Sequence, residues 1–164
     1  MSFFSTAASG GSNKAGSGVS PRDDAIALLA RREYSRAELE RRLAGKGHDN
    51  EPIAECLDGL AQEGLQSDAR FAEVFVRSYI ARDQGPLKIR AKLDERGIKS
   101  DLVRSSLENS DVDWFSLACQ ALAKRFDDAG GTPRERARRE RFLAGRGFDF
   151  DQTRHALSHA WDHH

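Results

Sequence analysis

The sequence predicts an all-α protein: three tandem three-helix (helix-turn-helix-like) repeats in an elongated, curved array of nine helices. Three observations predict this fold. Helix start and stop signals recur along the chain, apolar residues recur at helical spacing between them, and one short motif returns every 50 residues. No stretch shows the sustained β-branched alternation that a strand would need.

Capping residues mark the expected helix starts. Ser20, Ser35 and Thr132 each stand three residues before a carboxylate, which is the spacing of a capping box. The other starts are predicted at Asn50, Ser67, Gly85-Pro86, Ser100, Asp111 or Asp113, and Asp149. Glycine follows four of the helical patterns, where a left-handed residue closes the last turn; these glycines are Gly47, Gly64, Gly97 and Gly147.

The 50-residue period defines the repeats. The segments 43–47, 93–97 and 143–147 all begin with Leu and end with Gly, and Leu57, Leu107 and Leu157 follow at the same interval. Three helices per period make a small module whose second and third helices share one core. The predicted boundaries are residues 20–65, 66–110 and 111–164, after a disordered Ser/Gly-rich tail at 1–19.

The first helix of the middle repeat carries the longest apolar stripe. Phe71, Phe75 and Tyr79 recur at a spacing of four, and Ala72, Val76 and Ile80 stand beside them. This spacing places the residues on one helix face, and we interpret that face as core packing rather than a ligand site.

Composition limits the function classes. The chain has 164 residues, 38% of them hydrophobic, and no apolar run approaches the length of about 20 residues that a transmembrane helix needs. We therefore predict no membrane association, and we expect a cytoplasmic protein because no secretory signal pattern is visible. Cys56 and Cys119 lack a C-x-x-C partner, and we predict that both are buried, reduced thiols.

The net charge of zero conceals a segregation of charge. Lys and Arg number 26, and so do Asp and Glu. The three second-helix windows, 36–47, 86–97 and 136–147, hold thirteen basic and five acidic residues, whereas the third-helix windows, 48–63, 98–113 and 148–163, hold three basic and twelve acidic residues. A basic track along the second helices predicts a binding site for a polyanion.

A helical wheel orients this basic track. Positions 38, 41 and 45 point away from the core and Arg42 lies on the flank, and the same geometry exposes Lys88, Lys92, Arg138 and Arg141. The alternative is a solvated face with intrahelical ion pairs, for example between Glu38 and Arg42. Arg139 occupies the register of Leu39 and Ile89, so either its stem extends outward or the third repeat packs more loosely.

Patterns that would carry catalysis are weak. His155, His159 and His163 recur at a spacing of four before His164, a spacing that can bind a transition metal, but the glutamate of a zinc protease is absent. We interpret this face as at most an adventitious metal binder. The segment around Lys46 lacks the frame of a phosphate-binding loop. We predict no enzymatic activity, no cofactor, no metal and no small-molecule substrate.

Four stretches together resemble the RecX family of bacterial RecA regulators. They are Tyr34-Ser35-Arg36-Ala37-Glu38-Leu39 with Leu43 and Gly47, then Leu65 to Ala72, Gly85 to Ile89 with Leu93, Arg96 and Gly97, and finally Arg141 to Phe148. The resemblance covers residues 23–160. It implies three tandem three-helix repeats, which agrees with the period found above.

The resemblance implies a non-enzymatic modulator of RecA. Such a protein lies in the groove of the RecA filament, suppresses ATP hydrolysis, strand exchange and coprotease function, and contacts single-stranded DNA and, more weakly, duplex DNA. On this hypothesis the RecA- and DNA-binding residues are Arg41, Arg42, Lys46, Lys88, Arg90, Lys92, Arg96, Arg138, Arg141 and Arg146. The alternative is a helix-turn-helix transcriptional regulator whose second or third helices read duplex DNA.

Overall fold

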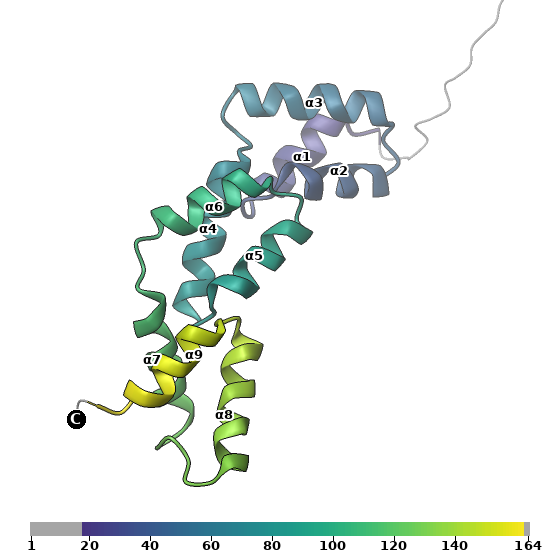
Figure 1. The fold of residues 1–164 in the computed structure, drawn as a ribbon. Coiled ribbons are helices and arrows are strands. Elements are labelled where there is room, and N and C mark those ends of the chain that lie inside the picture. The colour runs from purple at the N-terminus through teal and green to yellow at the C-terminus, as the bar shows by residue number, and fades with distance from the viewer. Residues whose placement is uncertain (1–17, 163–164) are drawn as a thin grey trace, which may run out of the picture. The chain divides into compact units, whose positions relative to one another are not determined.

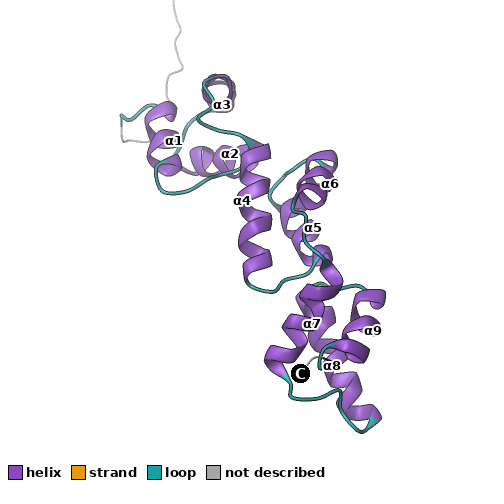
Figure 2. Ribbon diagram, turned by 90° about the vertical axis from the view of Figure 1, so that its left-hand side faces the viewer, coloured by secondary structure: helices purple, strands orange, loops and turns teal. Residues whose placement is uncertain are grey.

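The computed structural model describes residues 18–162, which contain nine helices and no strand (Figures 1 and 2). The all-α prediction is confirmed for this part of the chain. The predicted tail lies outside the described residues up to residue 17. The helices are α1 (Pro21–Leu29), α2 (Arg36–Gly45), α3 (Asn50–Gln62), α4 (Asp68–Ala81), α5 (Pro86–Glu95), α6 (Ser100–Asn109), α7 (Trp114–Arg125), α8 (Pro133–Arg146) and α9 (Phe150–His159).

Capping chemistry begins most of the helices where the sequence predicts. Ser35 and Thr132 form reciprocal capping boxes with Glu38 and Glu135, and the Ser20 hydroxyl accepts a hydrogen bond from the Asp23 N–H at 3.0 Å. Asp149 forms a further capping box. These caps stabilise the first turns because they bind N–H groups that have no partner within the helix.

Three further starts agree with the prediction. Of the two candidates for α7, Asp113 caps the helix, and a hydrogen bond from the Ser116 hydroxyl holds the pKa of Asp113 below its usual value. Helices α3 and α6 begin at Asn50 and Ser100 as predicted, after the N-cap residues Asp49 and Lys99. The four predicted glycine stops are confirmed, since all four have φ between 78° and 98°.

The described residues up to Phe71 form one compact unit, whose core lies between α1, α2 and α3. Seven buried residues make this core: Ala25, Tyr34, Leu39, Leu43, Ile53, Leu57 and Leu60. At its surface the Asp24 carboxylate contacts the His48 ring at 2.7 Å. The apolar stripes predicted for the second and third helices therefore face one shared core, as the period indicates.

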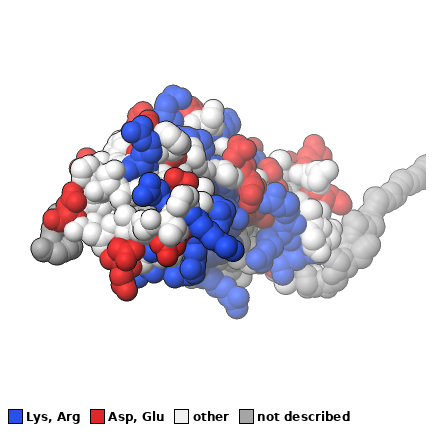
Figure 3. All heavy atoms as spheres, turned by 60° about the horizontal axis from the view of Figure 1, so that its bottom comes forward, with Lys and Arg blue, Asp and Glu red and all other residues white. Residues whose placement is uncertain are grey.

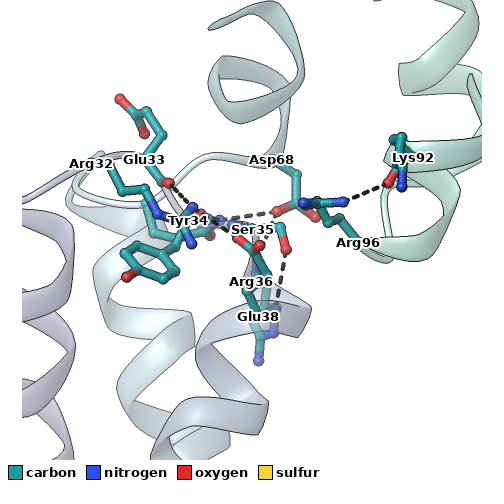
Figure 4. A network of polar contacts seen from close by, with 10 residues as sticks. Arg32, Glu33, Tyr34, Ser35, Arg36, Glu38, Asp68, Lys92 and Arg96 are labelled. Carbon is teal, nitrogen blue, oxygen red and sulfur yellow. Dashed lines mark hydrogen bonds and ion pairs between the residues drawn. The ribbon is translucent and has the colours of Figure 1, made fainter. Parts of the chain in front are cut away.

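Polar contacts fasten the start of α4 to the start of α2 within this unit (Figure 4). The Asp68 carboxylate accepts the Arg36 N–H at 2.8 Å and the Gln66 amide at 3.0 Å. Gln66 is buried and also donates to the Tyr34 carbonyl. The Arg36 N–H in the first turn of α2 has no partner within the helix and thus binds a carboxylate from the next segment, as helix N-termini favour.

The described residues from Ala72 onward form the second unit, in which α7, α8 and α9 enclose the largest described core. Its buried side chains include Leu117, Leu122, Leu143 and Phe148. Ile89 and Leu93 of α5, with Val103 and Leu107 of α6, are also buried. The predicted Leu positions at the ends of the second helices, Leu93 and Leu143, are therefore core residues.

The C-terminus of α8 meets the N-terminus of α5 inside this second unit. The Gly85 N–H donates to the Arg146 carbonyl at 2.7 Å, and the Leu87 N–H donates to the Gly147 carbonyl at 2.9 Å. A Cβ on Gly85 would lie 2.5 Å from the Gly147 carbonyl, and one on Gly147 would lie 2.6 Å from the Lys88 nitrogen. Both positions need glycine because the two backbones approach so closely.

Buried Asp83 fastens the loop before α5 to α7. Its carboxylate accepts hydrogen bonds from the Gln120 amide and the Lys124 ammonium, both at 2.9 Å. Asp83 has a φ of 59°, an uncommon value for a residue other than glycine. The two bonds satisfy a buried charge and hold the α4–α5 connection beside the α8–α5 junction.

The aromatic stripe of α4 is only partly a core element. Phe71, Ala72 and Val76 are buried as predicted, but Phe75 and Tyr79 are half-buried. Their rings stack at 4.3 Å between centroids, and the Arg96 guanidinium lies 5.2 Å from the Phe75 centroid. The prediction that the whole stripe is buried in the core was therefore wrong for Phe75 and Tyr79.

Both cysteines are free, as predicted, but the prediction that they are buried was wrong. Cys56 and Cys119 are half-buried. Partial burial raises the pKa of each thiol, because desolvation disfavours the thiolate. Both side chains pack against core clusters, so at neutral pH they contribute apolar contacts as neutral thiols.

The α8–α5 junction predicts opposite effects for two neighbouring glycines. We expect Gly147→Ala to lower the free energy of unfolding by about 2 kcal/mol or more, because alanine is strained at positive φ and clashes with α5. Gly145→Ala, in the α8 interior with nothing within 4 Å, is the matched control and should add about 0.5–1 kcal/mol. Urea titrations of both variants measure the difference. Equal stabilities would contradict the close contact.

Candidate functional site

Basic side chains line the outer faces of α2, α5 and α8, the second helix of each predicted repeat. Six of the ten predicted binding residues are exposed: Arg41, Arg42, Lys46, Arg90, Arg138 and Arg141. The other four, Lys88, Lys92, Arg96 and Arg146, are half-buried. Lys88 and Lys92 were predicted to be exposed, and the structure corrects this.

In the first unit the basic residues cluster at the C-terminal half of α2. Arg41, Arg42 and Lys46 are exposed, and none of them makes an ion pair among residues 18–162. Arg42 lies 5.4 Å from the Tyr34 ring, a cation–π contact that leaves its charge uncompensated. Glu38 was predicted to point away from the core, but it is half-buried because it closes the α2 capping box.

On α5 the basic side chains partly serve the fold. Lys88 donates to the Gly145 carbonyl at 3.4 Å, and Lys92 lies 3.9 Å from the Glu95 carboxylate. Arg96 donates to the Lys92 carbonyl at 3.4 Å and lies above the Phe75 ring. Arg90 is the exposed member of this group. The junction with α8 draws in Lys88 at the start of α5, whereas Arg96 at the other end of the helix lies against the Phe75 ring of α4.

In the second unit two arginines of α8 make cation–π contacts with aromatic rings. Phe126 and Phe142 meet edge to face, with centroids 5.6 Å apart. The Arg138 guanidinium lies 5.6 Å from the Phe126 centroid, and that of Arg146 lies 4.8 Å from the Phe142 centroid. Cation–π contacts orient a guanidinium without neutralising it. Figure 3 shows Lys and Arg side chains gathered on the drawn face, with fewer acidic ones between them.

The contact between Phe126 and Phe142 was not predicted from the sequence. Phe126 follows α7 directly and Phe142 lies within α8, so the two rings come from different elements. Their side-by-side placement depends on the α7–α8 loop. The available signal was the position of Phe142 beside Arg141 and of Phe126 beside Arg125, since arginines commonly stack on neighbouring aromatic rings.

Arg139 is a structural residue rather than a binding residue. It is buried, its Nε donates to the Asp128 carbonyl at 2.7 Å, and one terminal nitrogen donates to the Glu135 carbonyl at 2.9 Å. Its guanidinium also lies 4.4 Å from the Phe126 centroid. The side chain thus holds the α7–α8 loop against α8, and this role differs from both of the predicted alternatives.

Surface ion pairing accounts for only part of the basic track. Along α2, Arg36 pairs with Glu40 at 3.4 Å and with Asp58 at 2.9 Å. Lys92 on α5 and Arg139 on α8 are also paired. The exposed members of the predicted set have no ion pair among the described residues. Their charge is available to an external anion.

The C-terminal histidines do not form a metal centre within the described residues. His155 and His159 lie 4.6 Å apart between ring centroids, and the Asp162 carboxylate contacts His159 at 2.7 Å. No group of three or more His, Cys, Asp or Glu side chains in residues 18–162 could hold a metal ion. His163 and His164 lie outside this range. None of the helices described is long and apolar enough to span a membrane.

Three family models match the chain in succession. They describe the first, second and third three-helix domains of RecX and match residues 22–60, 67–107 and 111–157. A regulatory protein RecX from Chromohalobacter salexigens is 63% identical over 144 residues, covering 88% of this chain and 95% of that protein. One from Halorhodospira halophila is 44% identical over 142 residues, covering 85% and 87%.

Solved structures share the fold. The crystal structure of RecX from Lactobacillus salivarius superimposes with a TM-score of 0.70 at 21% identity, covering 85% of this chain and 94% of that one. A second crystal structure, of regulatory protein RecX, has a TM-score of 0.75 at 19% identity and covers 84% and 71%. The likeness supports a three-repeat helical fold.

The contacts of Arg139 predict that leucine cannot replace it, although leucine fits the register of Leu39. We expect Arg139→Leu to lower the free energy of unfolding by about 1–3 kcal/mol, because it leaves the Asp128 carbonyl without its donor. Arg138→Leu, on the exposed side of the same helix, should change stability by no more than about 0.5 kcal/mol. Thermal unfolding measures both variants. A more stable Arg139→Leu protein would show that the register favours an apolar residue.

Proposed function

The chain belongs to the RecX family, and we propose that this regulatory protein binds the RecA–DNA filament and inhibits the ATPase, recombinase and coprotease activities of RecA. It acts by binding rather than by catalysis, and it works in the cytoplasm on DNA repair and the SOS response. The observation that carries the proposal is the basic track of α2, α5 and α8, in which the exposed members of the predicted binding set make no ion pair within residues 18–162.

The charge pattern supports contact with a nucleoprotein filament. A filament presents DNA phosphates and acidic protein surface along an extended path, and Lys and Arg on successive modules can follow such a path. The exposed Arg138 guanidinium, already oriented by the Phe126 ring, loses less conformational entropy when it binds phosphate. Single-stranded DNA is the proposed nucleic-acid partner, and duplex DNA binds more weakly.

The third helices argue against a helix-turn-helix transcriptional regulator. Helix α3 carries Glu51, Glu55 and Asp58 and has no Lys or Arg. A recognition helix must lie between two phosphate backbones in the major groove, where such carboxylates are repelled. Band shifts on random and single-stranded DNA separate the two hypotheses, because a transcription factor requires one preferred duplex.

ATP turnover by RecA on single-stranded DNA tests the proposal directly. We expect the hydrolysis rate to fall as the protein is added and to reach a minimum at saturating protein. The physical reason is that a ligand of the active filament shifts its population toward the conformation that binds the ligand best. Unchanged hydrolysis at saturation would refute inhibition, provided that sedimentation shows the protein bound to the filament.

Reversal of two free charges should weaken filament binding without unfolding the protein. We expect Arg138→Glu with Arg141→Glu to reduce affinity about tenfold or more at low salt and to lower the slope of log affinity against log salt by about 2. Arg31→Glu with Arg77→Glu reverses two exposed charges outside the track and serves as the control. Fluorescence anisotropy across a salt series measures both. Affinity that does not depend on salt would contradict a role for the track.

A further inference from the structure

A groove between α5 and α6 lies within the second unit. Its wider part is a hollow of about 560 Å³, and a second hollow of about 300 Å³ continues it toward α7 and α9. Leu87, Arg90 and Arg104 line both hollows. Ala91 and Val103 add apolar surface in the wider part, and Trp114 lines the narrower part. The groove therefore has room for at least one side chain of a partner.

Two features make this groove unusual on the surface of a small domain. Leu87 is 47% exposed, although Ala91 and Val103 in the same hollow offer apolar surface. Arg90 and Arg104 are exposed, and neither makes an ion pair among the residues described. Arg and Trp are enriched among interface hot spots, and this groove combines Arg90 and Arg104 with Trp114 and the exposed Leu87.

The repeat period shows that these residues are not required by the module. Where the middle repeat has Leu87, the equivalent positions hold Ala37 and Ala137. Arg90 stands where the other repeats have Glu40 and Glu140. The charge at this position is thus inverted in one repeat of three. Since the same three-helix core forms with alanine and glutamate, packing does not explain leucine and arginine here.

The acidic residues of the lining restrict the ligand. Asp94 and Glu108 are exposed, and Asp94 lines the wider hollow while Glu108 lines the narrower one. Asp149 accepts the Gln152 N–H at 2.8 Å and is engaged in capping α9. A phosphate chain running through the groove would pass these carboxylates and be repelled. A ligand with an isolated negative charge beside an apolar group avoids that repulsion.

We propose that this groove binds a short acidic segment of a protein partner, with a carboxylate paired to Arg90 and Arg104 and an adjacent apolar side chain packed on Leu87. Guanidinium groups bind carboxylates in bidentate geometry, and an apolar neighbour gains from the hollow that Ala91 and Val103 line. This site extends the proposed function and does not require RecA to be the partner.

The test uses the full-length protein labelled with nitrogen-15 and short Gly/Ser peptides with a central Asp-Leu-Glu sequence. We expect this peptide to shift the amide signals of Leu87, Arg90, Val103, Arg104 and Trp114. Peptides with a central Asn-Leu-Gln or Asp-Ser-Glu should bind at least about fivefold more weakly. The first lacks the carboxylates that pair with the two arginines, and the second lacks the apolar side chain that packs on Leu87. If all three peptides bind equally, or none binds, the groove is not an acidic-peptide site.

Variants and a DNA probe complete the test. Arg90→Glu with Arg104→Glu should abolish the shifts and Leu87→Ala should weaken them several-fold, while Arg31→Glu with Arg77→Glu should leave them unchanged. Circular dichroism shows whether each variant is folded. A short oligothymidine that shifts the same amides more strongly than the peptide would assign the groove to nucleic acid and overturn the proposal. Since RecA is absent from these samples, the result is separate from that of the ATPase test.

Discussion

The second unit depends on the junction at which the end of α8 meets the start of α5. The last carbonyls of one helix and the first N–H groups of the other have no partners within their own helices, and here they bind each other through Gly85, Leu87, Arg146 and Gly147. The opposite ends of two helix dipoles also meet at this point. Because the backbones approach so closely, neither glycine can carry a side chain. Asp83 reinforces the same connection by binding α7.

This junction divides the cations into those that serve the fold and those that face solvent. Lys88 donates to the Gly145 carbonyl and Arg146 donates to the Arg82 carbonyl, so these two half-buried basic residues are partly engaged with the backbone. Arg138 and Arg141 lie farther from the contact and stay exposed. Counting all the basic residues of α5 and α8 therefore overestimates how many of them can bind an external anion. The useful quantity is the number of cations with no internal partner, which net charge does not report.

Local signals carried most of what the sequence could predict. Caps, N1 prolines and terminal glycines depend on neighbours within a few residues, so helix order, number and type follow from them in the described chain. Arg139 and the Phe126–Phe142 pair could not be predicted in this way, because their partners lie on other elements. The exposures of Lys88 and Phe75 were predicted wrongly for the same reason. A helical wheel gives the direction of each side chain around its own helix but contains no information about the neighbouring helices.

Departures from the repeat separate structural from binding residues more sharply than exposure alone does. Arg139 departs from the register of Leu39 and Ile89, and buried hydrogen bonds to the Asp128 and Glu135 carbonyls account for it. Arg90 departs from the register of Glu40 and Glu140, and no ion pair within the described residues accounts for that change. A buried residue that leaves the pattern of its module needs a partner within the fold, as Arg139 has. Arg90 is exposed and has no such partner among the described residues, and this is why we propose a carboxylate of another molecule as its ligand.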